Sequence, residues 1–334
     1  MKETHAKATV ICFPPGTKFP RRNYVSGAEL SFRGGRKPAE RKQVSGAEWE
    51  EDMSIRILCD STCDYTTQQA DELGISLVPL RVVWGAEEYY DGVTMQPEEF
   101  FDKLAASELL PTTSQPSPEA FLPHFRAAKE AGDEVICILL SAALSGTCQS
   151  ALIARDMVEY DGIHIIDSRQ ASLGAQLLIG HALKMREEGR SAEEIVSVLE
   201  EERERVRIYL IVDTLLYLQK GGRLSAAGMT VGSALNLKPV LEVSGGGVHV
   251  AGIARSQKGA WEKILRLLEK SGGMDPMSGY NLGFTGKRAC LDAFEAFMEE
   301  RLGTACGRVV SVGSVIGVHV GPGANAVAVV LQKR

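Results

Sequence analysis

Short apolar runs alternate with segments of helical spacing between residues 55 and 204. Buried strands of a parallel sheet are short and almost continuously apolar, and the helices that connect them fill the intervals. The predicted strands are Ile55–Cys59, Ile75–Val83, the hairpin arm Glu87–Tyr90, Val135–Leu140 and Ile163–Ile166. The predicted helices are Thr66–Leu73, Pro97–Ala106, Pro118–Ala131, a segment beginning near Gln149, Leu173–Glu188 and Ser191–Glu204. This alternation predicts a mostly parallel sheet with right-handed crossovers.

The pattern changes after about Arg205, where strand-like runs become more frequent than helices. The predicted strands are Ile208–Val212, Val240–Val243, Val248–Ile253, Val309–Val312, Val315–Val318 and Ala326–Leu331. The predicted helices are Thr214–Lys220, Trp261–Leu268 and Cys290–Leu302. Three glycines after Ser244 are a hairpin signal between two of the strands. We therefore expect two α/β domains, 53–205 with a mostly parallel sheet and 206–334 with a mixed sheet, separated by a cleft.

Residues 1–52 differ from the rest of the chain. They are rich in Gly, Pro, Arg and Lys, and the segment Val-Ser-Gly-Ala-Glu occurs twice, at Val25 and at Val44. Such a segment buries too little apolar surface to offset the entropy of ordering it. We predict a disordered basic extension, and the alternative is a basic tail that binds a partner.

Composition excludes several classes of function. The formal net charge of -6 argues against a nucleic-acid binder. Seven scattered cysteines without a Cys-x-x-Cys pair, and six separated histidines, predict no disulfide framework and no metal site. Phosphate-binding and dinucleotide-binding glycine motifs are absent from the sequence. No apolar run approaches the ~18 residues of a membrane span, so we expect a cytoplasmic protein without cofactor or stable membrane insertion.

Small hydroxyl residues follow several of the predicted strands. Leu144-Ser145-Gly146-Thr147 lies between a strand and a helix, and Thr112-Thr113-Ser114-Gln115-Pro116 precedes it by some thirty residues. Asp60-Ser61 and Asp167-Ser168 each end an apolar strand. Such residues at the carboxyl ends of buried strands, next to helix amino termini, suit a negatively charged group. The alternative for the two Asp-Ser pairs is ordinary helix capping.

Two further segments carry residues that can contact an anion. Arg223 follows two glycines, which permit a tight turn, and its guanidinium suits a carboxylate or phosphate. The alternative is a glycine helix cap with a surface arginine. His319 lies in a predicted apolar strand, where a structural role is common, but Gly321-Pro322-Gly323 follows it and indicates a close backbone approach.

In combination and in this order, these motifs resemble the DegV family of bacterial fatty-acid-binding proteins over about residues 55–332. The segments that carry the resemblance begin at Asp60, Tyr90, Thr113, Leu144, Asp167, Asp213, Gly221, Leu237 and His319. The resemblance implies two domains with one long-chain fatty acid in a tunnel at their junction. It also implies that a separate ATP-dependent fatty acid kinase subunit phosphorylates the bound carboxylate to an acyl phosphate.

The resemblance also assigns roles to individual residues. It implies that the Thr113 and Ser145 hydroxyls hold the carboxylate with the Gly146 amide nearby, and that His319 lies near the head group. The remaining candidates for a head-group or partner contact are Arg223, Arg255, Ser114, Ser61 and Ser168. Two departures from the family pattern are Val320 in place of Thr and Cys148 in place of an aromatic residue.

Two other hypotheses use the same residues. An acyl hydrolase or transferase would use Ser145 as nucleophile and His319 as base, but the Gly-x-Ser-x-Gly elbow of such enzymes is missing. A carrier of another amphipathic anion would share the site and differ only in its ligand. We expect a lipid-binding carrier subunit rather than an enzyme, with no catalytic residue of its own and no long exposed apolar stripe, and hence a monomer.

Overall fold

The computed structural model describes residues 54–225 and 237–333. The predicted extension 1–52 lies outside the described residues. The first sheet has four parallel strands in the order β2-β1-β6-β7. These strands are β1 (Ile55–Asp60), β2 (Ile75–Val78), β6 (Glu134–Leu139) and β7 (Ile163–Asp167). A parallel sheet therefore forms where the apolar runs alternate with helices, as the sequence predicts.

Helices cover both faces of this parallel sheet. They are α1 (Thr67–Leu73), α3 (Pro118–Ala131), α4 (Thr147–Val158), α5 (Ser172–Glu187) and α6 (Ala192–Glu202). Side chains alternate along β1, so that Leu58 packs with α3 and α4 while Ile57 packs with α5 and α6. A reciprocal capping box between Ser191 and Glu194 opens α6, as the sequence predicts.

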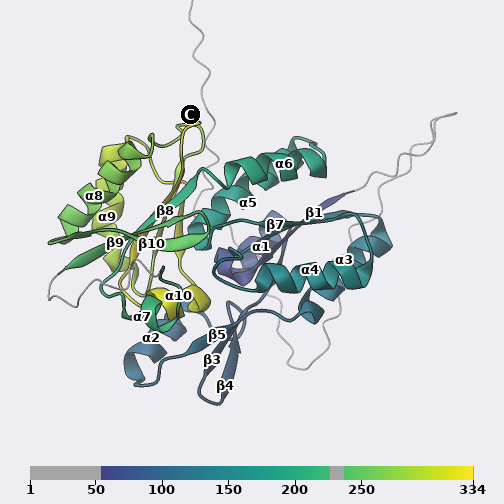
Figure 1. Cartoon of the computed structure of the whole chain (residues 1–334), viewed down its shortest axis with the longest axis horizontal. Coiled ribbons are helices and arrows are strands. Elements are labelled where there is room, and N and C mark those ends of the chain that lie inside the picture. The colour runs from purple at the N-terminus through teal and green to yellow at the C-terminus, as the bar shows by residue number, and fades with distance from the viewer. Residues whose placement is uncertain (1–53, 226–236, 334) are drawn as a thin grey trace, which may run out of the picture. The chain divides into compact units, whose positions relative to one another are not determined.

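The second sheet has six strands in the order β10-β9-β8-β13-β11-β12 and is mixed. All of its pairs are antiparallel except β11 with β12. The strands are β8 (Val206–Ile211), β9 (Lys238–Ser244), β10 (Gly247–Ala254), β11 (Tyr280–Phe284), β12 (Arg308–Ser311) and β13 (Asn325–Val330). Helices α8 (Gln257–Lys270) and α9 (Asp292–Leu302) lie on one side of this sheet (Figure 1). The other face, with Ile208 and Leu210, packs against the start of α5.

A third, smaller sheet has the strand order β4-β3-β5 and is antiparallel. Its strands are β3 (Arg81–Trp84), β4 (Glu87–Tyr90) and β5 (Thr112–Ser114). It packs with the helices α2 (Pro97–Ala106), α7 (Leu216–Lys220) and α10 (Ser314–Val320). The short 3-10 turns η1 (Ser61–Cys63) and η3 (Arg288–Cys290) also lie among the described residues. Figure 1 shows the small sheet beside α2 and below α10.

The structure corrects two of the predicted strands and adds two others. The single run Ile75–Val83 is divided between two sheets at Pro79, because proline has no N–H to donate to a sheet. The run Val315–Val318 forms α10 rather than a strand, although it is rich in β-branched residues. Strands β5 and β11 were not predicted from the sequence, because β5 is a three-residue polar segment and β11 contains Asn281 and Gly283.

Helix α5 joins the two larger sheets, because its buried side chains contact strands of both. Ser172 and Leu173 at its amino end lie next to the inner face of the mixed sheet, where a cavity is found. The mixed sheet begins with β8 at Val206. The division into domains 53–205 and 206–334 stays a prediction.

Candidate ligand-binding site

A cavity of about 360 Å³ lies between the parallel sheet, the inner face of the mixed sheet and α10. This volume is within the range of small-molecule sites in proteins. Most of its lining is apolar and comes from both larger sheets and from the helices between them. The apolar lining residues are Leu80, Leu140, Leu144, Ala171, Leu173, Ile208, Leu210, Leu218, Val243, Val248, Phe284, Val312, Val315, Ile316, Val320, Ala324 and Ala326. These walls suit an extended hydrocarbon.

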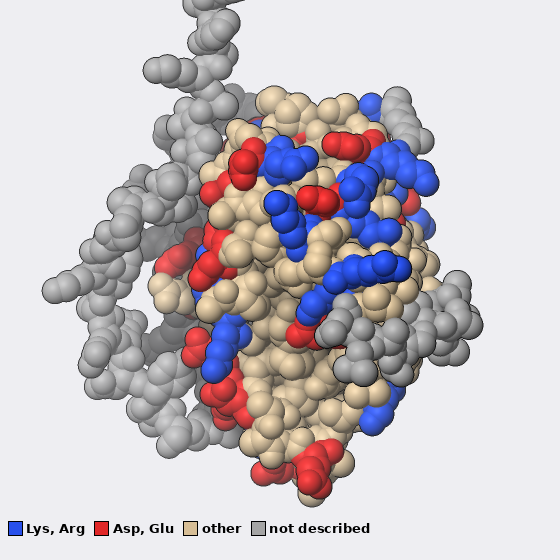
Figure 2. Space-filling view, turned by 90° about the vertical axis from the view of Figure 1, so that its left-hand side faces the viewer, with Lys and Arg blue, Asp and Glu red and all other residues tan. Residues whose placement is uncertain are grey.

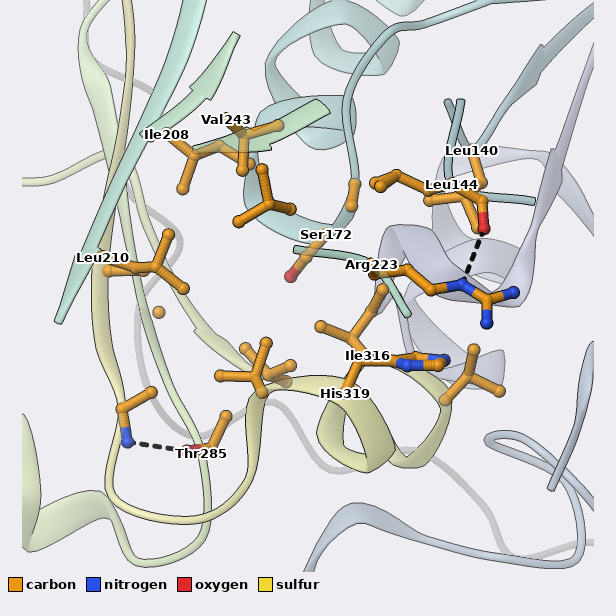
Figure 3. A pocket seen from close by; sticks show the side chains of 18 of the residues that line it. Leu140, Leu144, Ser172, Ile208, Leu210, Arg223, Val243, Thr285, Ile316 and His319 are labelled. Carbon is orange, nitrogen blue, oxygen red and sulfur yellow. Dashed lines mark hydrogen bonds between the residues drawn. The ribbon is translucent and has the colours of Figure 1, made fainter. Parts of the chain in front are cut away.

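Polar side chains gather at one end of the cavity. Strand β5 with the residue that follows it, the turn before α4, the segment after α7 and the last turn of α10 each supply part of this group. Its members are Thr113, Ser114, Gln115, Ser145, Arg223 and His319. Figure 3 shows Arg223 and His319 side by side at this end, while Ile208, Leu210 and Val243 lie at the other. The cavity therefore has one end rich in polar side chains and a mostly apolar remainder, where Ser172 and Thr285 are the other polar lining residues.

His319 occupies the last turn of α10 and joins this helix to the small sheet. Its Nε2 atom lies 2.9 Å from Thr113 Oγ1, within hydrogen-bond distance. Its Nδ1 atom is buried and has no hydrogen-bond partner among the described residues. A side chain at Gly221 would bring its Cβ to 2.2 Å from this Nδ1 atom, so glycine is needed there. The close approach predicted for the Gly-Pro-Gly segment occurs at Gly321, which faces the ring of Tyr217.

The electrostatic surroundings of His319 keep its ring neutral. Burial, followed by the positive charge of Arg223, lowers the pKa of His319 to about 4. At pH 7 the ring is therefore uncharged, and it offers one N–H group and one acceptor nitrogen. A neutral imidazole suits a hydrogen bond to a ligand oxygen without an additional charge to desolvate.

Arg223 holds the loop that carries Ser145. Its Nε donates to the carbonyl oxygen of Leu144 at 3.1 Å, and its Nη1 donates to the carbonyl oxygen of Gly221 at 2.5 Å. Within the described ranges no carboxylate forms an ion pair with Arg223, so its charge is available to attract an anionic ligand. Backbone carbonyls fix the guanidinium at the polar end of the cavity.

Ser145 and Gly146 form the turn that opens α4. The Ser145 hydroxyl lines the cavity and lies 2.9 Å from Thr147 Oγ1. Gly146 is the N-cap of α4 and does not itself line the cavity. A Cβ at this position would come within 2.1 Å of the end of the Gln115 side chain, so a larger residue would displace that side chain. The structure thus brings Thr113, Ser145 and His319 to one end of the cavity, with Gly146 directly behind Ser145.

Ser61, Ser168 and Arg255 lie away from the cavity. The Ser61 hydroxyl donates to Asp91 Oδ2 at 2.9 Å, and the buried Ser168 hydroxyl bonds the backbone of Gln170. Both hydroxyls bond within the protein, and neither caps a helix; in the first Asp-Ser pair the Asp60 side chain caps η1 by accepting from the Thr62 amide. Arg255 is exposed just before α8. Figure 2 shows one face of the protein, on which Lys and Arg side chains are interspersed with Asp and Glu.

Ser114 does line the cavity, and its buried hydroxyl has no hydrogen-bond partner within the part of the chain that the structure describes. Three polar lining residues were not predicted as candidates: Gln115, Ser172 and Thr285. Gln115 is part of the Thr-Thr-Ser-Gln-Pro segment, which could have indicated it. Ser172 has a positive φ of 48°, and its hydroxyl donates a hydrogen bond to Asp64. No sequence pattern predicts this contact.

A second cavity of about 550 Å³ adjoins the polar end. It shares Thr113, Arg223 and His319 with the first and is also lined by Glu108 and Lys220. The polar end of the inner cavity is therefore next to a larger space with charged side chains. A ligand group bound at Thr113 and His319 would therefore be accessible from both cavities.

A possible metal-binding group lies elsewhere, around α9. Ligand atoms of Glu295, Glu299 and Cys306 all lie within 4.8 Å of one another. Glu295 already forms an ion pair with Arg288. Burial, followed by the charge of Glu295, raises the pKa of the Cys306 thiol to about 11, which disfavours the thiolate that binds metals.

In the described residues no helix is both long enough and apolar enough to cross a bilayer.

The fold and the cavity define a class of protein: an α/β protein with two larger sheets around a mostly apolar cavity whose polar side chains gather at one end. The profile described as uncharacterised protein, DegV family, matches residues 54–332. The chain belongs to the DegV family. A DegV domain-containing protein of Caldanaerobacter subterraneus is 38% identical over 273 residues, which cover 82% of this chain and 97% of that protein.

Solved structures of the family agree with the fold. A fatty-acid-binding DegV family protein from Thermus thermophilus is 35% identical, with a TM-score of 0.74 over 84% of this chain and 100% of that one. A stearic-acid-binding protein from Eubacterium ventriosum is 28% identical, with a TM-score of 0.77 over 83% of this chain and 98% of that one. These similarities support the two-sheet α/β architecture and connect the family with fatty acid binding.

The low pKa of His319 predicts a pH-dependent stability. Its folded pKa of about 4 lies below the ordinary 6.5, so the unfolded chain binds a proton more readily. The free energy of unfolding should therefore fall as the pH is lowered from about 6.5 to about 4. The full shift corresponds to about 3 kcal/mol, and partial exposure of the ring reduces the expected loss to about 1–2 kcal/mol.

Urea unfolding of the ligand-free protein and of His319→Gln at pH 7.5 and at about pH 4.5 measures this effect. The difference between the two proteins isolates His319 from the buried carboxyl groups, which both proteins contain. An equal pH dependence in both proteins would contradict the assignment of a low pKa to this ring.

Proposed function

We propose that this chain binds one long-chain fatty acid, with its hydrocarbon in the inner cavity and its carboxylate at Thr113, Ser145 and His319. The observation that carries the proposal is a mostly apolar cavity with a group of polar side chains gathered at one end. The binding of fatty acids by DegV family proteins of known structure supports it. A fatty acid has the same division into one polar and one apolar end.

The hydrocarbon chain supplies most of the affinity. Transfer of sixteen carbons from water is worth on the order of 12 kcal/mol at ~0.8 kcal/mol per methylene, before the costs of association. A charge-assisted hydrogen bond to the carboxylate adds about 1.5–3 kcal/mol. The polar residues therefore decide which end of the ligand reaches Thr113 and His319, while the apolar walls hold the ligand.

The polar end binds a carboxylate without a basic side chain in direct ion pairing. The Thr113 and Ser145 hydroxyls donate to its oxygens. The Gly146 amide and the Ser114 hydroxyl, each next in sequence to one of these residues, are further donors. The neutral His319 ring keeps Thr113 in place, and the Arg223 charge offsets part of the cost of burying an anion. The bound carboxylate then faces the outer cavity.

We further propose that the chain presents this carboxylate to an ATP-dependent fatty acid kinase, which forms the acyl phosphate. The outer cavity, which shares Thr113, Arg223 and His319 with the inner one, gives a second molecule access to the carboxylate. The carboxylate is itself the nucleophile in such a transfer, so this chain needs no general base. Arg223 and the exposed Arg255 are candidate contacts for that partner, in the cytoplasm and with the chain as a monomer.

The hydrolase alternative finds less support in the geometry. It requires His319 to accept a proton from the Ser145 hydroxyl. In the structure His319 Nε2 is paired with Thr113, and Ser145 Oγ is paired with Thr147. A base with a pKa of about 4 is also weak at neutral pH.

Native mass spectrometry of the purified protein, followed by denaturation and lipid extraction, tests the proposal. We expect a single adduct with the mass of a fatty acid, which is released when the protein unfolds. The delipidated protein should take up one equivalent of added palmitate or oleate. A protein that is empty and takes up neither acid would refute the proposal. A covalent acyl adduct that survives denaturation would instead favour the Ser145 nucleophile.

A further inference from the structure

Helix α10 lines the cavity with Val315, Ile316 and His319, yet it is only seven residues long. A helix of this length has little stability of its own, so its position depends on tertiary contacts. Its N-cap residue is Gly313, which provides no capping side chain. The amides that open the helix must therefore find acceptors from elsewhere in the chain.

Asp91 supplies such acceptors from a position 223 residues earlier. Its Oδ1 atom accepts from the Ser314 amide at 2.9 Å, from the Ser314 hydroxyl at 2.6 Å and from the Val315 amide at 3.4 Å. Its Oδ2 atom accepts from the Ser61 hydroxyl at 2.9 Å. Asp91 is 3% exposed and directly follows β4. A buried carboxylate thus performs the capping that the local sequence does not.

The small sheet holds α10 at both ends. Asp91 follows β4 and binds the first residues of the helix, while Thr113 on β5 binds His319 in its last turn. Strand β3 pairs with both β4 and β5, so the two contacts belong to one rigid unit. A change at Asp91 would therefore be transmitted along the helix to the ring that lies at the polar end of the cavity.

A second carboxylate reinforces this arrangement. Asp64 Oδ1 accepts from the Gly313 amide at 2.9 Å, and Asp64 Oδ2 accepts from the Ser172 hydroxyl, which lines the cavity. No lysine or arginine pairs with Asp64 or Asp91 within the described residues. Burial raises the pKa of both groups, and their mutual repulsion raises that of Asp64 further. Both carboxyl groups are buried in the structure although burial destabilises their charged form.

We propose that Asp91 is a positioning residue of the ligand site, which fixes α10 and thereby sets the orientation of His319 against Thr113. Asp91 lies outside the lining of both cavities, so it acts through the helix rather than through the ligand. The effect on ligand affinity rests on the proposed fatty acid site. The effect on His319 does not, because it can be observed in the ligand-free protein.

The test is an NMR titration of the His319 ring in ligand-free Asp91→Ala, with the resonance assigned by its loss in His319→Gln. Among the described residues the charged and titratable groups around the ring in wild type are Arg223, the neighbouring Tyr217, and Lys220 and Glu108 across the outer cavity. These groups are unchanged in the variant. We expect the pKa of His319 to rise from about 4 toward 6.5 by roughly one unit or more, because a displaced ring is better hydrated. We also expect the affinity for palmitate to fall about tenfold.

Asp60→Asn is the matched control. Asp60 is equally buried and binds backbone amides, those of Thr62 and Leu140, but it does not contact α10. It should lower the melting temperature without moving the pKa of His319. If Asp91→Ala does not fold, Ser314→Ala replaces it, because it removes one donor to Asp91 and should shift the pKa in the same direction.

An unchanged pKa of His319 in a folded Asp91→Ala or Ser314→Ala protein would overturn the proposal, as would an equal shift in Asp60→Asn. If wild type binds no palmitate but the pKa shift is found, the proposed function fails and the positioning role stands. If wild type binds palmitate but the pKa of His319 is unchanged in Asp91→Ala, the proposed function stands and the positioning role fails.

Discussion

Ala326→Phe is expected to exclude long fatty acids while the protein stays folded. Ala326 lies on β13 opposite Leu210 of β8, and both side chains line the apolar part of the cavity. A phenyl ring there would occupy space that the hydrocarbon chain would otherwise fill. The loss of about three methylene contacts at ~0.8 kcal/mol each weakens binding by about 2.4 kcal/mol, or roughly 60-fold.

Calorimetric titration of the delipidated protein with saturated acids of increasing length measures this effect. The loss should be large for palmitate and small for an eight-carbon acid, whose chain does not reach position 326. The matched control is Ala326→Ser, which alters the same strand position without filling the cavity. The melting temperature of the ligand-free Ala326→Phe protein should not fall, since the ring enters existing space. Equal affinities for palmitate in wild type and Ala326→Phe would show that the chain lies elsewhere.

Thr113→Ala and Ser145→Ala should impair acyl phosphate formation much more than fatty acid binding. The apolar walls retain the hydrocarbon in both variants, so we expect palmitate affinity to fall by less than about tenfold. Transfer of a phosphoryl group requires the carboxylate to be accurately oriented, and a misplacement of about 1 Å can cost on the order of 100-fold in rate. Each variant is therefore expected to lose about 100-fold in acyl phosphate formation.

The rate is measured with ATP, labelled palmitate and the fatty acid kinase subunit of a bacterium that contains a DegV protein. Ser117→Ala is the control, because it removes an exposed hydroxyl from the same segment as Thr113 but outside the cavity. Equal rates in wild type and both site variants would exclude these hydroxyls as the carboxylate contacts. A parallel loss of binding and rate would mean that they hold the ligand rather than orient it.

Much of the site could be predicted because its residues lie in short segments with local meaning. Ser145 follows a buried strand and Thr113 lies in a short run of small hydroxyl residues, and such residues before a helix indicate a site for an anion. Ser61 and Ser168 show the limit of this reasoning. They occupy the same kind of position, but their hydroxyls bind Asp91 and the backbone of Gln170. A strand end indicates where polar groups are needed, and it does not show whether a ligand or the protein uses them.

The helix that carries His319 could not be predicted from the local sequence pattern. The run Val315-Ile316-Gly317-Val318 has the composition of a strand, because β-branched residues favour extended backbone. It forms a helix because Asp64 and Asp91 accept its first amides and because Gly317 allows it to pack against Phe100 and Phe101. These contacts outweigh the local preference. Their partners are more than 200 residues away in the chain, so no sequence window contains them.

The sequence by itself determined the alternation of strands and helices, the helix caps and the segments that carry the polar site. These features depend on hydrophobic periodicity and turn residues within a few positions of one another, so they can be predicted from the sequence alone. Only the tertiary structure decided that Thr113 meets His319, that α10 is a helix, and that apolar side chains of two sheets enclose one cavity. Each of these results needs segments distant in the chain to be brought together, and the free energy gained by packing them then overrides the weaker local preferences.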